Sequence, residues 1–177
     1  LTGIVGGRPT VYPVIRLFSF LIDKCACALQ VEINGQRIPV DLPEVAAFDP
    51  AQVAAETPLP TVQETPQSSV PLVKLAVARS GDKGNHSNIG VMARKPEYLA
   101  WIAAALTPEA VAEWMQHVLD GQNSKVSRWH LPASHSLNFL LENALGGGGV
   151  ASLRIDPQGK AFAQQLLEFP VPVPQGL

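Results

Sequence analysis

The residues with the clearest capacity for chemistry lie in one polar stretch, residues 79–88, of a chain that is otherwise poor in charge. Gly, Asn and Asp favour tight turns, whose exposed backbone N–H groups can receive an anionic or carbonyl-bearing group. The stretch therefore predicts a binding site for such a group, with an ordinary polar connection between two strands as the alternative. The candidate ligand-binding residues are Arg79, Ser80, Gly81, Asp82, Lys83, Gly84, Asn85 and Asn88.

Asp82 and His86 are the candidates for acid–base catalysis within this stretch. His86 is the only one of the four histidines that lies in such a polar context. Asp82 could orient the imidazole, while Lys83 or Arg79 could hold an anion. The spacing alone does not show whether a nucleophile lies within reach of a base. Neither Ser80 nor Ser87 lies in a G-x-S-x-G motif. Catalysis is therefore a second hypothesis beside binding.

The four consecutive glycines at 146–149 invite comparison with a phosphate-binding loop. Such a loop follows a strand and opens a helix, where free N–H groups point at the anion. Here the glycines follow an expected helix and precede an expected strand, and no Walker lysine comes after them. The run therefore predicts a helix C-cap and a close passage of backbone, with nucleotide binding as the alternative.

The metal-ligating residue types are too dispersed to predict a metal site or a resident cofactor. Cys25 and Cys27 are two residues apart, a spacing at which a disulfide is strained and zinc lacks a second ligand pair. We expect buried or half-buried free thiols in a reducing cytoplasm. The histidines form no His-x-x-x-His pair.

The polar stretch must be positioned by the elements around it, and alternating apolar residues predict a strand on each side, at 72–79 and 88–94. Helical spacing then predicts two helices within 96–119, the second capped by Thr107. A strand is expected at 125–131, followed by a helix that Ser134 or Ser136 caps and whose apolar stripe runs from Leu137 to Leu145. A strand at 150–155 and a helix after Asp156, with Phe162 and Leu166 facing inward, come next. The last expected element is an edge strand or strap at 168–173.

This order of elements predicts an α+β fold, a sandwich of a mixed β-sheet with helices on one face. One variant of that arrangement is ferredoxin-like. We expect the domain to span residues 72–173, with Leu153 and the tryptophans 101, 114 and 129 in its core.

The residues before this domain divide into two parts. Residues 1–42 predict a β segment, with a buried strand at 14–22 and a hairpin turning at Asn34-Gly35. Residues 43–71 carry six prolines and predict a semi-rigid linker. A hairpin with one extra strand is barely stable alone. We therefore expect residues 1–42 to need a further surface to pack on, and the first residue, Leu1, indicates a processed product or a C-terminal piece of a longer protein.

The composition of the chain excludes several classes of function. The chain has 177 residues, of which 46% are apolar and 16% charged, with a net charge of −2. Without a basic cluster, the composition argues against nucleic-acid and anionic-membrane partners. The longest apolar run near the start, residues 17–22, is too short to cross a bilayer and lacks the layout of a signal peptide. These features favour a cytoplasmic protein.

Several motifs, in register along the chain, resemble the acyclic terpene utilisation (AtuA-like) family. Residues 72–169 resemble its C-terminal ferredoxin-fold domain, and residues 6–9 and 14–21 resemble the end of its larger N-terminal region. The motifs are Ala78-Arg79-Ser80-Gly81-Asp82-Lys83-Gly84-Asn85, Asn88-Ile89-Gly90-Val91 with Arg94, Leu137-Asn138-Phe139, Ala144-Leu145 before the four glycines, and Ser152-Leu153-Arg154-Ile155-Asp156 with Gly159-Lys160-Ala161.

The resemblance implies an intracellular protein of acyl-CoA-linked catabolism of terpenoid or branched-chain acids. Because a rigid α+β scaffold presents one polar stretch, we expect this domain to be a binding or assembly module that contributes residues 79–88 to a site. It would pack on the missing N-terminal domain of the same protein, of which residues 1–42 would be the remnant. The alternative is a catalytic domain acting on an acyl-CoA or a carboxylate. No cofactor is expected, and a homo-oligomer is an open possibility. His86 departs from the small or acidic residue that the resemblance implies at its position.

Overall fold

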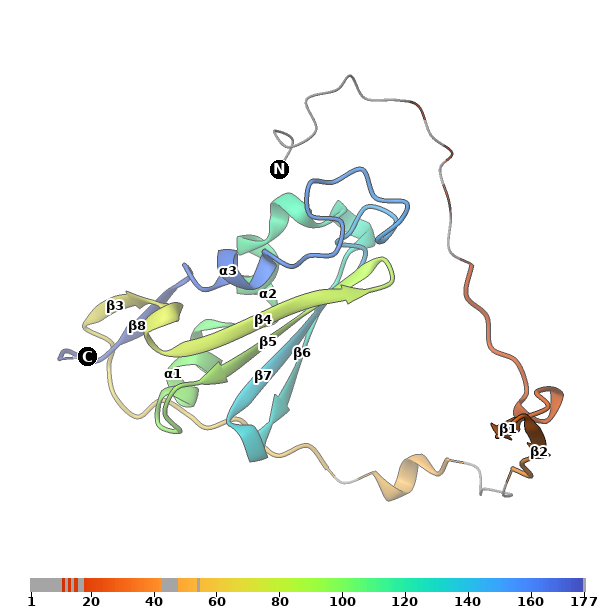
Figure 1. The fold of residues 1–177 in the computed structure, drawn as a ribbon. Helices are drawn as coiled ribbons and strands as arrows, with labels where there is room; N and C mark the ends of the chain where they lie inside the picture. The colour runs from red at the N-terminus through yellow and green to blue at the C-terminus, as the bar shows by residue number, and fades with distance from the viewer. Residues whose placement is uncertain are drawn as a thin grey trace. The chain divides into compact units, whose positions relative to one another are not determined.

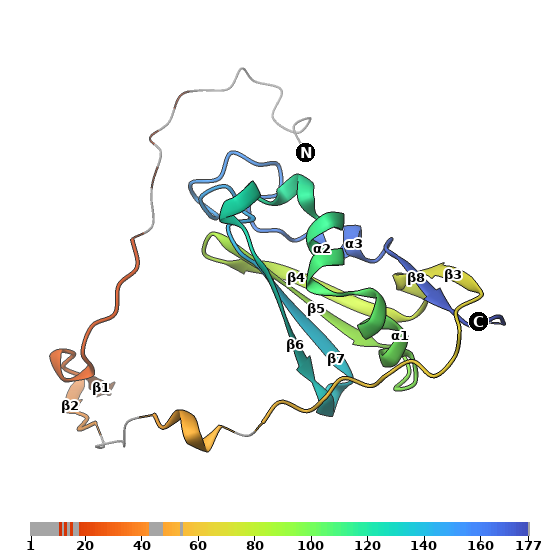
Figure 2. The same ribbon diagram turned by 180° about the vertical axis from the view of Figure 1, so that it is seen from behind.

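The computed structural model describes residues 11, 13, 15, 18–42, 48–53 and 55–176, and these divide into two compact units. One unit comprises the described residues between Leu17 and Ala55. The other contains those from Glu56 onward, and Figures 1 and 2 show its strands and helices from opposite sides. Among the described residues, no helix has the length and apolar content needed to cross a membrane.

The smaller unit contains the predicted hairpin. Strands β1 (Gln30–Ile33) and β2 (Gln36–Pro39) pair antiparallel around Asn34-Gly35, whose φ angles are +52° and +78°. Two positive φ angles are what a type I′ turn requires, which is why Asn-Gly predicts it. Short 3₁₀ turns flank the hairpin at Lys24–Ala26 and Pro50–Gln52, each capped by the preceding aspartate.

The buried strand predicted at 14–22 is wrong for the residues that the structure describes. Residues 18–22 form no strand, and Phe18 is 84% exposed. Residues 14, 16 and 17 lie outside the described residues. The prediction of buried or half-buried thiols is also wrong, since Cys25 and Cys27 are free and exposed. Both predictions needed an apolar surface to pack on, and every residue of the neighbouring strands β1 and β2 is itself exposed.

The larger unit is built from strands and helices in the order β-β-β-α-α-β-β-α-β. Its strands and α-helices are β3 (Ser68–Pro71), β4 (Ala76–Lys83), β5 (His86–Ala93), α1 (Tyr98–Ala105), α2 (Pro108–Trp114), β6 (Val126–Leu131), β7 (Ser136–Leu141), α3 (Phe162–Leu166) and β8 (Pro170–Val173). Short 3₁₀ segments connect them at Leu72–Lys74, Gln116–Val118, Gly121–Asn123 and Pro132–Ser134.

A four-stranded antiparallel sheet in the order β4-β5-β7-β6 is the centre of this unit. A second, two-stranded sheet pairs β3 with β8 and so joins the start of the domain to its end. The structure confirms the predicted α+β, ferredoxin-like architecture with helices on one face, and it corrects one detail. The sheet is not mixed, because every pairing in it is antiparallel.

One face of the four-stranded sheet carries the core. Ile89 and Val91 of β5 and Phe139 of β7 point toward this face, and all three are buried. Helices α1, α2 and α3 cover this face, with Ile102 and Leu166 among their buried side chains (Figure 2). Burying each such side chain contributes about 1.5–3 kcal/mol. No helix of the described residues covers the opposite face.

The helices follow the predicted pattern in two places. Thr107 caps α2, because its Oγ1 accepts from the backbone N–H of Ala110 at 3.1 Å. The inward residues predicted for the last helix are confirmed, since Phe162 and Leu166 of α3 are buried. The tail is also as predicted, with β8 forming an edge strand that buries Val171 and Val173.

The helix predicted from the stripe Leu137–Leu145 is wrong, because residues Ser136–Leu141 form strand β7. The same leucines fit helical spacing and, together with Phe139, strand alternation. Pairing decides between the two, since β7 lies between β5 and β6 and satisfies the backbone groups of both. The turn between β6 and β7 places His135 at φ +48°, in the left-handed region.

The strand predicted at 150–155 is also wrong, because these residues form an irregular loop. Leu153, expected in the core, is 89% exposed. The tryptophans are less buried than predicted. Trp101 is half-buried against Tyr98, Trp114 keeps its indole N–H on the carbonyl oxygen of Gln165 at 3.0 Å, and Trp129 is exposed on the face without helices.

The segment predicted as a linker ends within the larger unit. Its last four residues form β3, as described above. Further upstream, Leu59 packs against the core, and the carbonyl oxygen of Thr57 lies 3.0 Å from Nδ1 of His130. Residues 56–71 therefore contact the domain as an extended strap.

Candidate functional site

The polar stretch 79–88 belongs to two paired strands and is not the loop that its composition predicts. Strand β4 continues to Lys83 and β5 begins at His86, so only Gly84 and Asn85 form the turn. Gly84 has φ +67°, as the first central residue of a type II′ turn requires. The polar residues upstream and downstream of the turn therefore have fixed directions, set by the ladder.

Strand alternation divides these side chains between the two faces of the sheet. Arg79 pairs with Gly90, Gly81 with Asn88, and Lys83 with His86, on the face without helices. Ser80 and Asp82 project from the other side of β4. Because β4 is an edge strand, its two faces and its free edge together can border a single groove.

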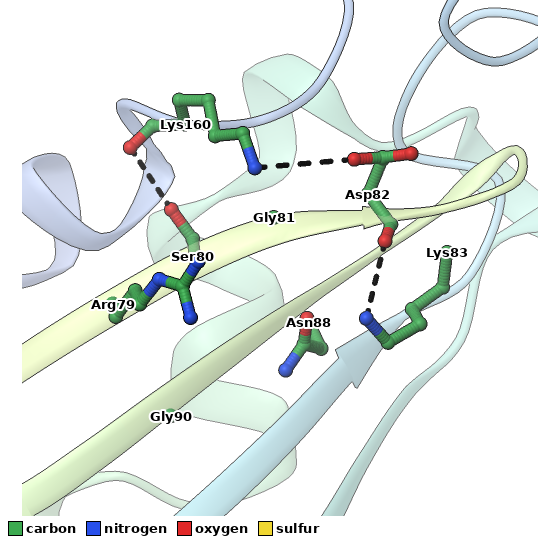
Figure 3. Close-up of a pocket in the computed structure, with 8 residues that line it drawn as sticks. All are labelled: Arg79, Ser80, Gly81, Asp82, Lys83, Asn88, Gly90 and Lys160. Carbon is green, nitrogen blue, oxygen red and sulfur yellow. Dashed lines mark hydrogen bonds and ion pairs between the residues drawn. The ribbon is translucent and has the colours of Figure 1, made fainter.

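A groove of about 330 Å³ runs along this edge of the sheet (Figure 3). Six of the eight predicted ligand-binding residues line it, and the two that do not are Gly84 and Asn85. Two further lining residues, Gly90 and Lys160, were not predicted as site residues. The complete lining is Arg79, Ser80, Gly81, Asp82, Lys83, Asn88, Gly90 and Lys160.

The groove brings together the cations of Arg79, Lys83 and Lys160 with a single carboxylate, that of Asp82. Lys160 Nζ lies 4.0 Å from Asp82 Oδ1, and both side chains are about half exposed, so this pair contributes little to stability. Lys83 Nζ donates to the carbonyl oxygen of Asp82 at 3.2 Å (Figure 3). The groove therefore carries an excess of positive charge with donors free to turn toward a ligand.

Lys160 reaches the groove because the segment before α3 is fastened at two points. The carboxylate of Asp156 accepts from the backbone N–H groups of Lys160 at 2.9 Å and Ala161 at 2.8 Å. The buried hydroxyl of Ser80 accepts from Ala163 N–H at 2.9 Å and donates to the Lys160 carbonyl oxygen at 3.1 Å. Ser80 is thus engaged with backbone groups and positions Lys160.

Two glycines leave the groove without side chains along part of its wall. A Cβ added at Gly81 would lie 3.1 Å from Lys160 Nζ, so the lysine occupies the space that a side chain would need. A Cβ at Gly90 would meet only the carbonyl oxygen of Arg79, at 3.9 Å. The space above Gly90 is therefore open.

The turn residues Gly84 and Asn85 anchor the glycine run. Asn85 Nδ2 donates to Asn143 Oδ1 at 3.0 Å, and Asn85 Oδ1 accepts from Gly147 N–H at 2.7 Å. A Cβ added at Gly148 would lie 2.8 Å from the carbonyl oxygen of Gly84, closer than real contacts allow. The glycines serve the close backbone passage that the sequence predicts, after a strand and not after a helix.

The two acid–base candidates do not come together. Asp82 pairs with the buried Ser87, whereas His86 pairs with Lys83, so Asp82 and His86 project from opposite faces of the sheet. His86 Nδ1 accepts from Asn143 N–H at 2.9 Å, and His86 is absent from the groove lining. Asp82 alone of the pair lies in the groove.

Gly90 and Lys160 are the site residues that the sequence did not predict, although both lie within the quoted motifs. No local pattern marks a lysine before a short helix as a neighbour of a strand 80 residues earlier. The spacing of Asp156 to Lys160 and Ala161 predicts a cap, but the partner on β4 follows only from the fold.

Comparison with known proteins yields one match. A family model described as the AtuA ferredoxin-like domain matches residues 70–172, which include every residue of the groove. No curated protein and no solved structure matches the chain. The matched range includes both sheets apart from the first two residues of β3 and the last residue of β8.

Proposed function

We propose that this chain, which belongs to the AtuA ferredoxin-like domain family, is a binding module whose groove along β4 receives the acidic group of a ligand. The observation that carries the proposal is the convergence of Arg79, Lys83 and Lys160 on one groove that holds a single carboxylate. Strand pairing fixes the backbones of Arg79 and Lys83, and the buried Ser80 hydroxyl holds the carbonyl of Lys160, so the three side chains start from fixed positions and part of the entropic cost of binding an anion is avoided.

The ligand class that we propose is an acyl-CoA or the corresponding carboxylate, within acyl-CoA-linked catabolism of terpenoid or branched-chain acids. Phosphate and carboxylate groups are the natural partners of arginine and lysine. The metabolic context comes from the resemblance described above. The groove supports the acidic end of such a ligand.

Binding accounts for the groove better than catalysis does. The hydroxyl of Ser80 is engaged with two backbone groups, and that of Ser87 donates to the carbonyl oxygen of Gly81 at 3.1 Å. Asp82 and His86 project from opposite faces of the sheet. Neither a hydroxyl nucleophile with a partner base nor an Asp–His pair therefore forms among the described residues of the groove.

Assembly is the second part of the proposal. Arg79 and Lys83 are exposed, so a partner surface can reach the same groove from solvent. The larger N-terminal region that the resemblance implies is the partner that we propose, with this domain supplying one wall of a shared site.

Titration calorimetry with inorganic phosphate, acetate and acetyl-CoA tests the binding step. Lys83→Met and Lys160→Met keep the apolar stem and remove the charge, so each is expected to weaken binding. Lys125→Met is the matched control, because Lys125 is exposed, lies directly before β6 and is outside the groove lining. Equal effects of the three substitutions, or no binding by the unmodified chain, would contradict the proposal.

A further inference from the structure

The face of the sheet without helices connects the groove to an exposed tryptophan. Arg79 pairs with Gly90, Gly90 with Asn138, and Asn138 with Trp129, so four residues form one row across β4, β5, β7 and β6 (Figure 1). Neighbouring strands lie about 4.8 Å apart, which places the two ends of the row about 14 Å from each other. The row begins at the cationic groove and ends at an aromatic ring.

Exposed apolar side chains occupy the neighbouring row of this face, which runs from β4 to β6 and includes Ser136 of β7. Val77, Met92 and Leu131 occupy the row two residues further along the same face, and Trp129 adjoins it. They are 39%, 46%, 47% and 41% exposed in the order Val77, Met92, Leu131, Trp129. Grouped apolar side chains on an otherwise polar face indicate a binding surface.

Gly90 leaves space for a ligand to extend along the row from Arg79 to Asn138. It lines the groove, and the space above it is open, as the near-absence of contacts to an added Cβ indicates. A side chain at this position would separate Arg79 from Asn138. The glycine instead leaves a channel from the cations toward the apolar end.

Asn138 is the third residue of the row, between Gly90 and Trp129, and can donate to a carbonyl. Its Oδ1 accepts from Asn88 Nδ2 at 3.2 Å, so the acceptor of Asn138 is engaged while its amide nitrogen carries two donors. A ligand that crosses the row meets a cation, an amide donor and then an apolar surface, in that order.

We infer that the face without helices holds the remainder of the ligand whose acidic group lies in the groove. The ligand is an extended anion with a carbonyl near the middle and an apolar end against Trp129 and Leu131 of β6. This inference rests on the proposed function of the groove, and it adds the apolar subsite and the class of molecule.

Calorimetry with N-acetylglycine and N-decanoylglycine tests it, because the two acids differ only in the apolar tail. The unmodified chain is expected to bind N-decanoylglycine at least about tenfold more tightly, from the apolar surface buried. Trp129→Ala is expected to remove most of this gain and to leave the affinity for N-acetylglycine unchanged, while Trp129→Phe restores part of it. Gly90→Val, compatible with a strand, is expected to weaken N-decanoylglycine binding by obstructing the channel.

The outcomes separate the inference from the proposal on which it rests. Equal affinities for the two acids in the unmodified chain, with Lys160→Met still weakening both, would overturn the apolar subsite and leave the groove standing. Absence of binding by either acid would overturn both. Sedimentation is the second measurement, and a dimer of the unmodified chain that Trp129→Ala dissociates would overturn the inference, because a second copy would then occupy this face.

Discussion

Ser80 fixes the position of Lys160, a residue 80 positions later in the chain, by donating from its Oγ to the lysine's carbonyl oxygen at 3.1 Å. The same hydroxyl accepts from the backbone N–H of Ala163 at 2.9 Å. Because Ser80 is buried and both partners are backbone groups, the start of α3 is held against β4. The contribution of Lys160 to the positive charge of the groove therefore depends on a hydroxyl whose own hydrogen bonds are internal.

Replacement of Ser80 by alanine is expected to lower the free energy of unfolding by about 1–3 kcal/mol, since the buried N–H of Ala163 and the part-buried carbonyl of Lys160 lose their partner. Ser69→Ala is the control, because Ser69 is exposed and its hydroxyl bond to Val171 is long, at 3.4 Å. Urea unfolding of both variants measures the difference. A loss for Ser80→Ala no larger than for the control would show that the hydroxyl does not hold α3.

Gly159 is expected to tolerate a side chain worse than any exposed glycine. It has φ +62°, and an added Cβ would lie 2.6 Å from Ser87 Oγ, so Gly159→Ala meets both backbone strain and a clash. Gly121→Ala is the matched control, with φ +50° and no atom within 4 Å. The left-handed conformation alone costs about 1–2 kcal/mol.

Thermal unfolding of the two alanine variants checks this expectation. Gly159→Ala should melt at the lower temperature, because only there does the side chain also displace a buried hydroxyl. Equal melting temperatures would mean that the segment before α3 relaxes away from Ser87.

Arg128 is expected to stabilise the C-terminus of α1. Its Nη1 donates to the carbonyl oxygens of Ala103 and Leu106, each at 2.7 Å. Burial lowers the pKa of Arg128, and the carboxylate of Glu109 opposes this effect. Arg128→Met should cost about 1.5–3 kcal/mol, the range for a hydrogen bond to a charged group.

Chemical denaturation measures this cost, with Arg94→Met as the control. Arg94 is also an arginine on a backbone carbonyl, that of Val73 at 3.0 Å, but it is exposed and makes one such bond. If Arg94→Met loses as much free energy of unfolding as Arg128→Met, the two hydrogen bonds from Arg128 to the carbonyl oxygens at the end of α1 do not stabilise the fold more than the single bond of Arg94.

Glu109 gives the stability a predictable dependence on pH. Hydrogen bonds from its own backbone N–H and from the Thr107 hydroxyl lower the pKa of Glu109 in the folded chain. A lowered pKa means that the stabilisation is present above the unfolded value, about 4.3, and is lost as the pH falls through the folded value. Urea midpoints measured across this acidic range should fall less steeply for Glu109→Gln, and identical profiles would contradict the assignment.

The sequence by itself determined the features whose causes are local. Asn34-Gly35 predicts the hairpin because only certain residues adopt two successive positive φ angles. Thr107 predicts a helix start because its side chain satisfies a backbone N–H within the next turn. The composition of residues 79–88 predicted six of the eight residues that line the groove, since charged and amide side chains gather in this stretch.

Only the tertiary structure decided how those residues are arranged. Leucines 137, 140 and 141 fit a helix or a strand, and pairing with β5 and β6 made the segment a strand. Residues read as a loop at 79–83 became part of an edge strand, which separated Asp82 from His86. Lys160 joined the groove through a hydrogen bond to Ser80. The physical reason is the same in each case. Strand pairing and buried polar groups form hydrogen bonds with residues far away in the sequence, and the spacing of neighbouring residues does not predict which distant residues these are.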